Sequence, residues 1–131
     1  MKYKFLLSGE TPSKKNSRRT LANGKTIPSK GFMIWHEQHY FELVKQKKPT
    51  VPLNRNLFIK MKFVHGDLVR RDSDNQATSV LDLLKDIQII EDDNWRIVSK
   101  IEIENFYDKG KSRCLVEITE NKKSQKSKKG K

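Results

Sequence analysis

The chain has 131 residues, of which 34% are hydrophobic and 34% are charged, and its formal net charge at pH 7 is +12. This size fits one globular domain. No apolar run approaches the ~20 residues of a membrane span, no signal peptide opens the chain, and a single cysteine, Cys114, excludes an internal disulfide framework. We therefore expect a soluble cytoplasmic protein without membrane contact whose partner is a polyanion, with nucleic acid favoured over a lipid surface.

The N-terminal part of the chain predicts a strand followed by a basic loop. Side chains alternate over residues 2–8, with Tyr3, Phe5 and Leu7 on the inner side. In the loop, basic residues gather where apolar anchors are missing, so it is either an ordinary solvated loop or an arm that contacts phosphates. These basic residues are Lys14, Lys15, Arg18 and Arg19. Asn23-Gly24 predicts a tight hairpin turn, because both residues tolerate a positive φ.

A helix is expected over residues 30–47, with Ser29 as its N-cap. Its apolar residues are assigned to one broad face, made of Met33, Tyr40, Leu43 and Val44 and widened by Phe32, Ile34, Trp35 and Phe41. His36 and His39 lie three residues apart on this helix, whereas a helical zinc site usually needs histidines four apart and a third ligand. We therefore interpret both as surface or core-edge histidines.

A second strand is predicted over residues 57–64, again from alternation. Its inward residues are Leu57, Ile59, Met61 and Phe63. Asp72 and Asp74 follow this strand. In an extended segment, residues two apart point to the same side, so we expect the two carboxylates to converge while Ser73 faces away.

A second helix is predicted over roughly residues 75–86. Its buried face has helical spacing and consists of Ala77, Val80, Leu81 and Leu84. Asn75, Thr78, Asp82 and Lys85 fall on the opposite side. Three isoleucines, at 87, 89 and 90, then return the chain to the core. This places Glu91-Asp92-Asp93 in a turn beside the sheet.

The last two strands are expected over residues 97–107 and 113–120, as an antiparallel hairpin with Ile101 and Ile103 pointing inward. Residues 121–131 contain six lysines and no acids, which predicts a disordered lysine-rich tail. The order of elements predicts an α+β fold, with a mixed sheet of about four to five strands and two main helices packed on it. Residues 1–120 would form this single domain.

The acidic residues stand out in a basic chain, because clustered carboxylates repel one another unless a cation neutralises them. Oxygen ligands at short spacing select hard cations such as Mg²⁺ or Mn²⁺. Such an ion can promote attack of water on a phosphodiester, and Arg70 and Arg71 can hold flanking phosphates by forked hydrogen bonds. The alternative is that Asp72 and Asp74 only cap a helix while the later acidic cluster is a solvated turn.

One stretch of the chain resembles the core of the RusA family of Holliday-junction resolvases. Arg71-Asp72-Ser73-Asp74-Asn75, a helix of about a dozen residues and Glu91-Asp92-Asp93 are similar to the family's basic residues, D-x-D-N, helix, and D-D or E-D-D turn. Pro12-Ser13-Lys14-Lys15-Asn16 is similar to the family's P-P-S-x-N loop. The close match covers about thirty residues.

The resemblance implies a RusA-like homodimer that cuts four-way DNA junctions by paired nicks with Mg²⁺, or with Mn²⁺ as a substitute, in DNA recombination and repair. The implied setting is the nucleoid of a bacterial or phage-infected cell. The implied catalytic and metal-binding residues are Asp72, Asp74 and Asp93, with Asp92 as a further metal ligand. The sequence departs from the family at Thr78, where a lysine is typical, so that either Lys85 or Arg71 supplies this charge or the enzyme is slow.

Further residues are assigned around this site. The DNA-binding set is Arg70, Arg71, Lys14, Lys15, Arg18, Arg19 and Lys85, and the auxiliary set is Asp82, Asn75 and Thr78. Two other functions are compatible with the sequence. One is a non-catalytic basic nucleic-acid-binding protein, and the other is an endonuclease that acts on another branched or single-stranded DNA.

Overall fold

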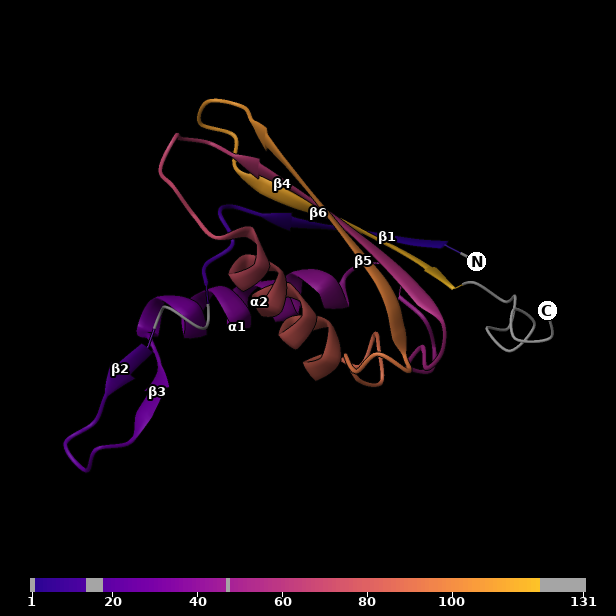
Figure 1. Cartoon of the computed structure of the whole chain (residues 1–131), viewed down its shortest axis with the longest axis horizontal. Coiled ribbons are helices and arrows are strands. Elements are labelled where there is room, and N and C mark those ends of the chain that lie inside the picture. Colours follow the sequence, from indigo (N-terminus) through magenta and orange to yellow (C-terminus); the bar gives the residue numbers. More distant parts are fainter. Residues whose placement is uncertain (1, 14–17, 47, 121–131) are drawn as a thin grey trace.

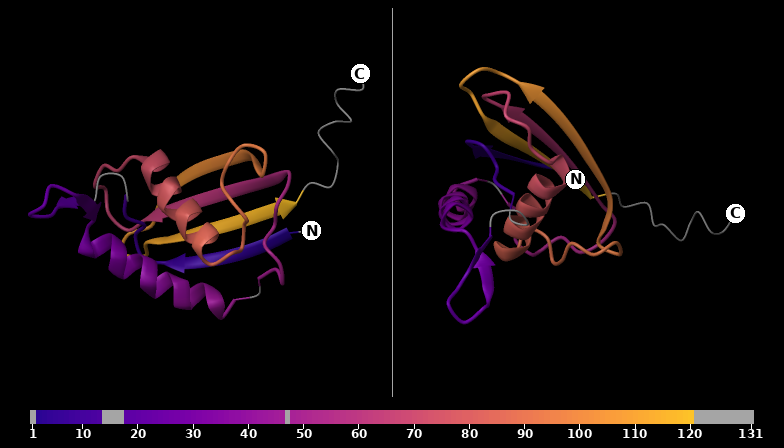
Figure 2. Two further views of the ribbon diagram at one scale, coloured as in Figure 1. Left: turned by 90° about the horizontal axis from the view of Figure 1, so that it is seen from below. Right: turned by 60° about the vertical axis from the view of Figure 1, so that its left-hand side comes forward.

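A computed structural model of the chain describes residues 2–13, 18–46 and 48–120. The main sheet contains β1 (Lys2–Ser8), β6 (Arg113–Glu120), β4 (Leu57–His65) and β5 (Val98–Tyr107), in that spatial order. The helices α1 (Lys30–Val44) and α2 (Ser73–Asp86) both cover one face of this sheet (Figure 1, Figure 2). The predicted α+β fold, with a mixed sheet and two packed helices, is confirmed.

The connection between the last two strands differs from the prediction. β5 pairs in parallel with β4, while β6 pairs antiparallel with both β4 and β1. The expected antiparallel hairpin of β5 and β6 is therefore wrong, because β4 lies between them. α2 is the crossover that brings β5 parallel to β4, as a parallel pair requires.

The turn between β5 and β6 crosses the end of β4 at Gly66. The backbone nitrogen of Gly110 donates to the carbonyl oxygen of Gly66 at 2.9 Å. A Cβ atom at position 66 would lie 3.2 Å from the backbone nitrogens of Lys111 and Ser112. Glycine at this position therefore allows the close approach of the two segments.

The core lies between the helices and the inner face of the sheet. A buried or partly buried row crosses all four strands, from Phe5 through Val116 and Met61 to Ile103, as the strand registers place them. The alternation predicted for β1 and β4 is confirmed. In β5, however, which is an edge strand, Ile101 is exposed, contrary to the prediction that it points inward.

α1 begins where predicted, since the side chain of Ser29 accepts a hydrogen bond from the backbone nitrogen of Phe32. It ends at Val44 rather than at residue 47. The predicted broad apolar face is wrong: the helix buries Phe32, Trp35, His39 and Leu43 and exposes Met33, Ile34, Tyr40, Phe41 and Val44. Apolar side chains lie nearly all around this helix, so periodicity alone does not select the packed face.

His39 anchors α1 to β1. Its ring nitrogens lie 2.7 Å from the carbonyl oxygen of Trp35 and 2.5 Å from that of Ser8. The side chain of Gln46 extends the contact, because it bonds both the backbone nitrogen and the carbonyl oxygen of Leu6 at 2.9 Å. His39 is thus a buried residue at the core edge.

A small hairpin of β2 (Arg18–Thr20) and β3 (Thr26–Pro28) projects away from the sheet and helices (Figure 1). The predicted turn is confirmed: Gly24 has a φ of 88°, and the backbone nitrogen of Leu21 donates to the carbonyl oxygen of Lys25 at 2.7 Å. Arg18 and Arg19, which were expected in the basic loop, instead belong to the short strand β2. Across the described residues, none of the helices is long and apolar enough to cross a membrane.

Candidate functional site

A cleft of about 750 Å³ opens at the N-terminal end of α2. Three segments form it: the chain after β1, the loop between β4 and α2, and the first turns of α2. Its lining residues are Glu10, Thr11, Pro12, Ser13, Arg70, Arg71, Asp72 and Gln76. The cleft therefore combines carboxylates with arginines, as the chemistry predicted from the sequence requires.

Asp72 and Asp74 lie at the start of α2, but not in an extended segment. Asp72 is the N-cap, with a φ of −86° and a ψ of 114°, and the helix already begins at Ser73. The prediction that Asp72 and Asp74 alternate along a strand is therefore wrong, because the backbone turns into the helix between them. Asp72 lines the cleft, whereas Asp74 lies outside the described lining and accepts a 2.9 Å hydrogen bond from the backbone nitrogen of Asn75.

The N-terminus of α2 stabilises the negative charges of Asp72 and Asp74. Backbone N–H groups at a helix N-terminus carry partial positive charge, which stabilises nearby anions. Asn75 also donates to Asp72, with 3.2 Å between Nδ2 and Oδ2. Asn75 is buried, contrary to the prediction that it lies on the exposed side of the helix, because its side chain turns back toward the N-cap.

Glu10 is the carboxylate in the cleft that the sequence analysis missed. Its Oε2 accepts a hydrogen bond from Gln76 Nε2 at 2.8 Å, and lies 2.8 Å from His65 Nδ1 and 3.6 Å from Arg71 Nε. His65 in turn bonds Asn105, with 2.8 Å between Nε2 and Oδ1. This network fixes one oxygen of Glu10 from several sides.

Three oxygen atoms around the cleft are buried and have no hydrogen-bond partner in the described part of the chain. They are Glu10 Oε1, Thr11 Oγ1 and Gln76 Oε1. Thr11 and Gln76 are only 2% and 1% exposed. A buried oxygen without a partner is costly. Carboxylate and amide oxygens are also ligands that hard cations accept. The cleft therefore contains ligand types that hard cations accept, but within the described residues no three acidic or histidine ligand atoms of the cleft lie within 4.8 Å of one another.

The two predicted phosphate-binding arginines differ in their surroundings. Arg71 makes a forked pair with Asp67, with Nη1 to Oδ1 at 2.8 Å and Nη2 to Oδ2 at 3.2 Å. This hydrogen bonding lowers the pKa of Asp67 and raises that of Arg71. Arg70 is exposed at the cleft and has no ion pair within the described ranges. Arg70 is therefore the guanidinium that is free to meet a phosphate.

The second acidic cluster lies at the other end of α2. Lys85 Nζ is 3.9 Å from Asp92 Oδ1 and 3.9 Å from Asp93 Oδ1, and the backbone nitrogen of Asp93 lowers the pKa of Asp92 by a hydrogen bond. The 14 residues of α2 span roughly 20 Å. The described part of one chain therefore does not bring Asp93 together with Asp72 and Asp74 (Figure 1).

The remaining predicted residues have these positions. Thr78 is exposed, and its hydroxyl donates to the carbonyl oxygen of Asp74 at 3.0 Å. Asp82 faces α1 and not the cleft, as described below. Lys14 and Lys15 lie outside the described residues. The backbone of Arg18 and Arg19 forms β2, and their side chains lie outside what the structure describes.

The neighbouring sequence gives little indication that Glu10, His65 and Gln76 belong to a functional site. Glu10 follows a strand by two positions, and His65 ends another. Polar residues at strand ends are common loop features. Gln76 lies 66 positions from Glu10, and no sequence pattern indicates their contact. Only the fold brings them together.

Comparison of the sequence with protein-family models and curated proteins identifies no relative. No protein-family model matches the chain, and a search of curated proteins gives no significant match. The similarity to RusA resolvases therefore rests on the residues quoted above.

Proposed function

We propose that the protein is a divalent-metal-dependent endodeoxyribonuclease that cuts branched DNA, with the four-way junction as its substrate, and that it acts as a homodimer. The observation that carries this proposal is the cleft at the start of α2. There, Asp72 and the exposed residue Arg70 line the same cleft as three residues that each have a buried side-chain oxygen with no hydrogen-bond partner in the described part of the chain: Glu10, Thr11 and Gln76.

In this proposal, Asp72 and Glu10 are the carboxylates that hold the cation, with Gln76 as a neutral oxygen donor. When bound, Mg²⁺ or Mn²⁺ promotes attack of water on a phosphodiester and offsets the charge that develops on it. The network of His65, Arg71 and Gln76 holds Glu10 in place. Arg70 binds a phosphate of the same strand by charge-assisted hydrogen bonds.

The acidic residues lie at opposite ends of α2, and this separation limits how a homodimer can use them. Asp92 and Asp93 lie a helix length from Asp72 in their own chain. The RusA-like role implied for Asp93 therefore requires that a second copy of the chain presents it to the cleft. Within one chain, Asp92 and Asp93 interact with Lys85 instead.

A specific observation favours a second candidate, a non-catalytic nucleic-acid-binding protein. Lys85 partly neutralises Asp92 and Asp93, and the N-terminus of α2 stabilises Asp72 and Asp74. Each acidic group thus has a structural role that needs no ion. In this alternative, the basic surface alone would bind DNA.

Cleavage and binding assays on a labelled four-way junction separate the two functions. With Mg²⁺ or Mn²⁺, wild-type protein is expected to nick the junction, while Asp72→Asn binds it without cutting. Glu102→Gln removes a carboxylate that pairs with Lys60, whose Nζ is 3.7 Å away, and serves as the matched control that keeps cutting. Wild-type protein that binds junctions but never cuts them would support the second candidate.

A further inference from the structure

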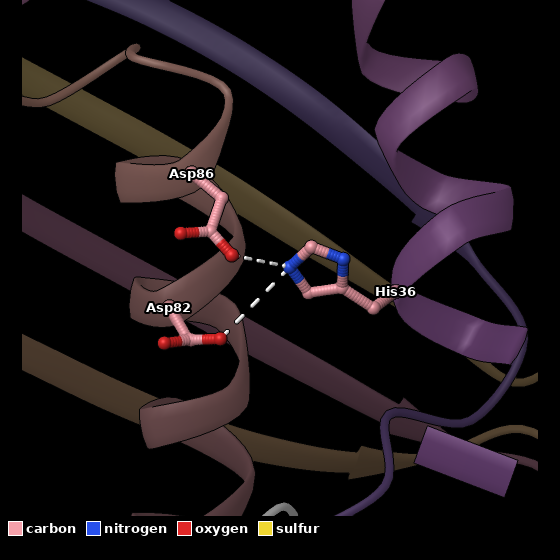
Figure 3. A group of neighbouring side chains, drawn as sticks. All are labelled: His36, Asp82 and Asp86. Carbon is pink, nitrogen blue, oxygen red and sulfur yellow. Dashed lines mark hydrogen bonds and ion pairs between the residues drawn. The ribbon is translucent and has the colours of Figure 1, made fainter. Parts of the chain in front are cut away.

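A second group of metal-ligand side chains lies between the two helices, away from the cleft. His36 extends from α1, and Asp82 and Asp86 extend from α2 (Figure 3). His36 Nε2 is 2.8 Å from Asp86 Oδ2 and 3.9 Å from Asp82 Oδ2. In the described part of the chain, this is the one group of three such residues whose ligand atoms all lie within 4.8 Å of one another.

The spacing of these atoms suits a bound ion. Zinc ligands lie about 2.0–2.2 Å from the metal, so neighbouring ligand atoms are about 3–3.5 Å apart. The His36–Asp86 and His36–Asp82 separations of 2.8 and 3.9 Å bracket that range, and the two carboxylate oxygens lie within 4.8 Å of each other. Asp82 and Asp86 are four residues apart and therefore share one face of α2. Phe32, four residues earlier on α1, lies near the ring of His36, with 5.8 Å between ring centroids.

Helix electrostatics disfavour these two carboxylates where they stand. Asp86 is the last residue of α2, and the C-terminal carbonyl groups of a helix repel negative charge within the last turn. Like charges four residues apart repel each other as well. This is the opposite of Asp72 and Asp74, which the N-terminus of the same helix stabilises. A divalent ion bound by both carboxylates would offset this repulsion.

We infer that His36, Asp82 and Asp86 form a binding site for a borderline transition-metal ion such as Zn²⁺ or Co²⁺, which links α1 to α2. An imidazole nitrogen with two carboxylate oxygens suits these ions better than Mg²⁺, which prefers oxygen ligands alone. The side chains of His36 and Asp82 are 22% and 21% exposed, so an ion can enter from solvent while its ligands stay largely fixed.

This inference is separate from the proposed nuclease activity. The site uses neither Asp72 nor Glu10, and the role of its ion is to hold the two helices together. It also changes the interpretation of His36. The sequence offers no third ligand near His36 and His39, but the fold brings two carboxylates to His36 from positions 46 and 50 residues later.

Co²⁺ and Zn²⁺ titrations of the full-length, tag-free, chelator-treated protein test this site. Co²⁺ bound by His36, Asp82 and Asp86 is expected to give a saturable visible absorption band that accounts for one ion per chain, separate from any ion in the cleft. Zn²⁺ is expected to raise the melting temperature, by roughly 10 °C at a hundredfold excess over its dissociation constant. His36→Gln and Asp86→Asn should each weaken Co²⁺ binding at least tenfold. Asp86→Asn is the safer variant, because the Asp86 side chain is 46% exposed.

Two matched variants keep the site intact. Glu37→Gln removes an exposed carboxylate next to His36, and Asp72→Asn removes the proposed ligand in the cleft. Both should keep the Co²⁺ band and the Zn²⁺ shift. The inference is overturned if wild-type protein shows neither signal, if both signals persist in Asp86→Asn, or if Asp72→Asn abolishes them.

Discussion

Gln76 donates a hydrogen bond of 2.8 Å to Glu10, across 66 positions of sequence, and so joins the first turn of α2 to the chain that follows β1. The same amide nitrogen lies 2.6 Å from the carbonyl oxygen of Thr11. These bonds fix Glu10 Oε2, while Glu10 Oε1 is buried and has no hydrogen-bond partner among the described residues. In the proposed function, Glu10 Oε1 is the oxygen that binds the cation.

Glu10→Gln tests this arrangement. If Glu10 Oε1 is a metal ligand, loss of its charge should raise the Mg²⁺ concentration needed for half-maximal cleavage by roughly tenfold. The shape of the side chain is kept, so the fold should persist with a modest loss of stability from the weakened contacts with His65 and Arg71. Glu117→Gln, on the open face of the sheet, is the control. An unchanged metal requirement would remove Glu10 from the site.

Mixing two inactive variants tests whether a second chain completes the site. Asp72→Asn and Asp93→Asn homodimers should both be inactive if both residues serve catalysis. If Asp93 acts on the partner's cleft, a mixed dimer contains one fully intact site, and nicking of one strand should return. Recovery is expected because α2 separates the two residues by roughly 20 Å within one chain. No recovery on refolding the variants together would contradict a shared site.

Arg70→Ala should weaken DNA binding through the loss of one phosphate contact. The slope of the logarithm of the binding constant against the logarithm of the salt concentration should decrease in magnitude by about 1. Lys25→Ala, at the tip of the projecting hairpin, shows by the same measurement whether that arm also touches DNA. An unchanged slope for Arg70→Ala would place the DNA elsewhere.

Gly66→Ala should destabilise the fold, because the new Cβ would lie 3.2 Å from two backbone nitrogens of the β5–β6 turn. We expect a loss of about 1–3 kcal/mol in the free energy of unfolding. Gly31→Ala is the control, since its nearest contact would be the Ser29 hydroxyl at 3.8 Å. As a glycine within α1, it should gain roughly 0.5–1 kcal/mol on replacement. Denaturant unfolding of both variants measures the difference.

The buried thiol of Cys114 predicts a loss of stability in alkali. Burial, with a smaller effect of the Glu10 carboxylate, raises the pKa of Cys114 to about 12, from an ordinary value of 9.0. Above pH 9 the unfolded chain therefore releases this proton while the folded chain keeps it, and stability falls as pH rises toward 12. Cys114→Ala should show a flatter fall between these values. An identical pH dependence would assign the loss to other groups.

The sequence predicts the parts of the fold that one local rule controls. Residues 57–63 alternate because one face of β4 is buried, and Ser29 caps α1 because its hydroxyl reaches a free backbone N–H group. The pairing of β5 was not predictable in this way. Its partner was decided by the α2 crossover, while its short turn to β6 suggested a hairpin. The spacing of apolar residues along the sequence does not show which strand β5 pairs with.

The candidate site shows the same limit. The carboxylates of Asp72 and Asp74 were predicted from residue type and from the similarity to RusA, but their expected convergence assumed a strand that had already become helix. Glu10 and His36 gain their neighbours from segments 66 and 50 positions away. Charge and chemistry could be predicted from the sequence, but distances between elements could not.

Diffraction from crystals soaked in Mn²⁺ would show directly whether the cleft holds a metal, because anomalous scattering locates the ion itself. We expect an ion in the cleft at the start of α2, bound by Asp72 and Glu10. A second ion beside His36, Asp82 and Asp86 would agree with the further site. A cleft that stays empty at Mn²⁺ concentrations that support DNA cleavage would rule out the proposed metal site.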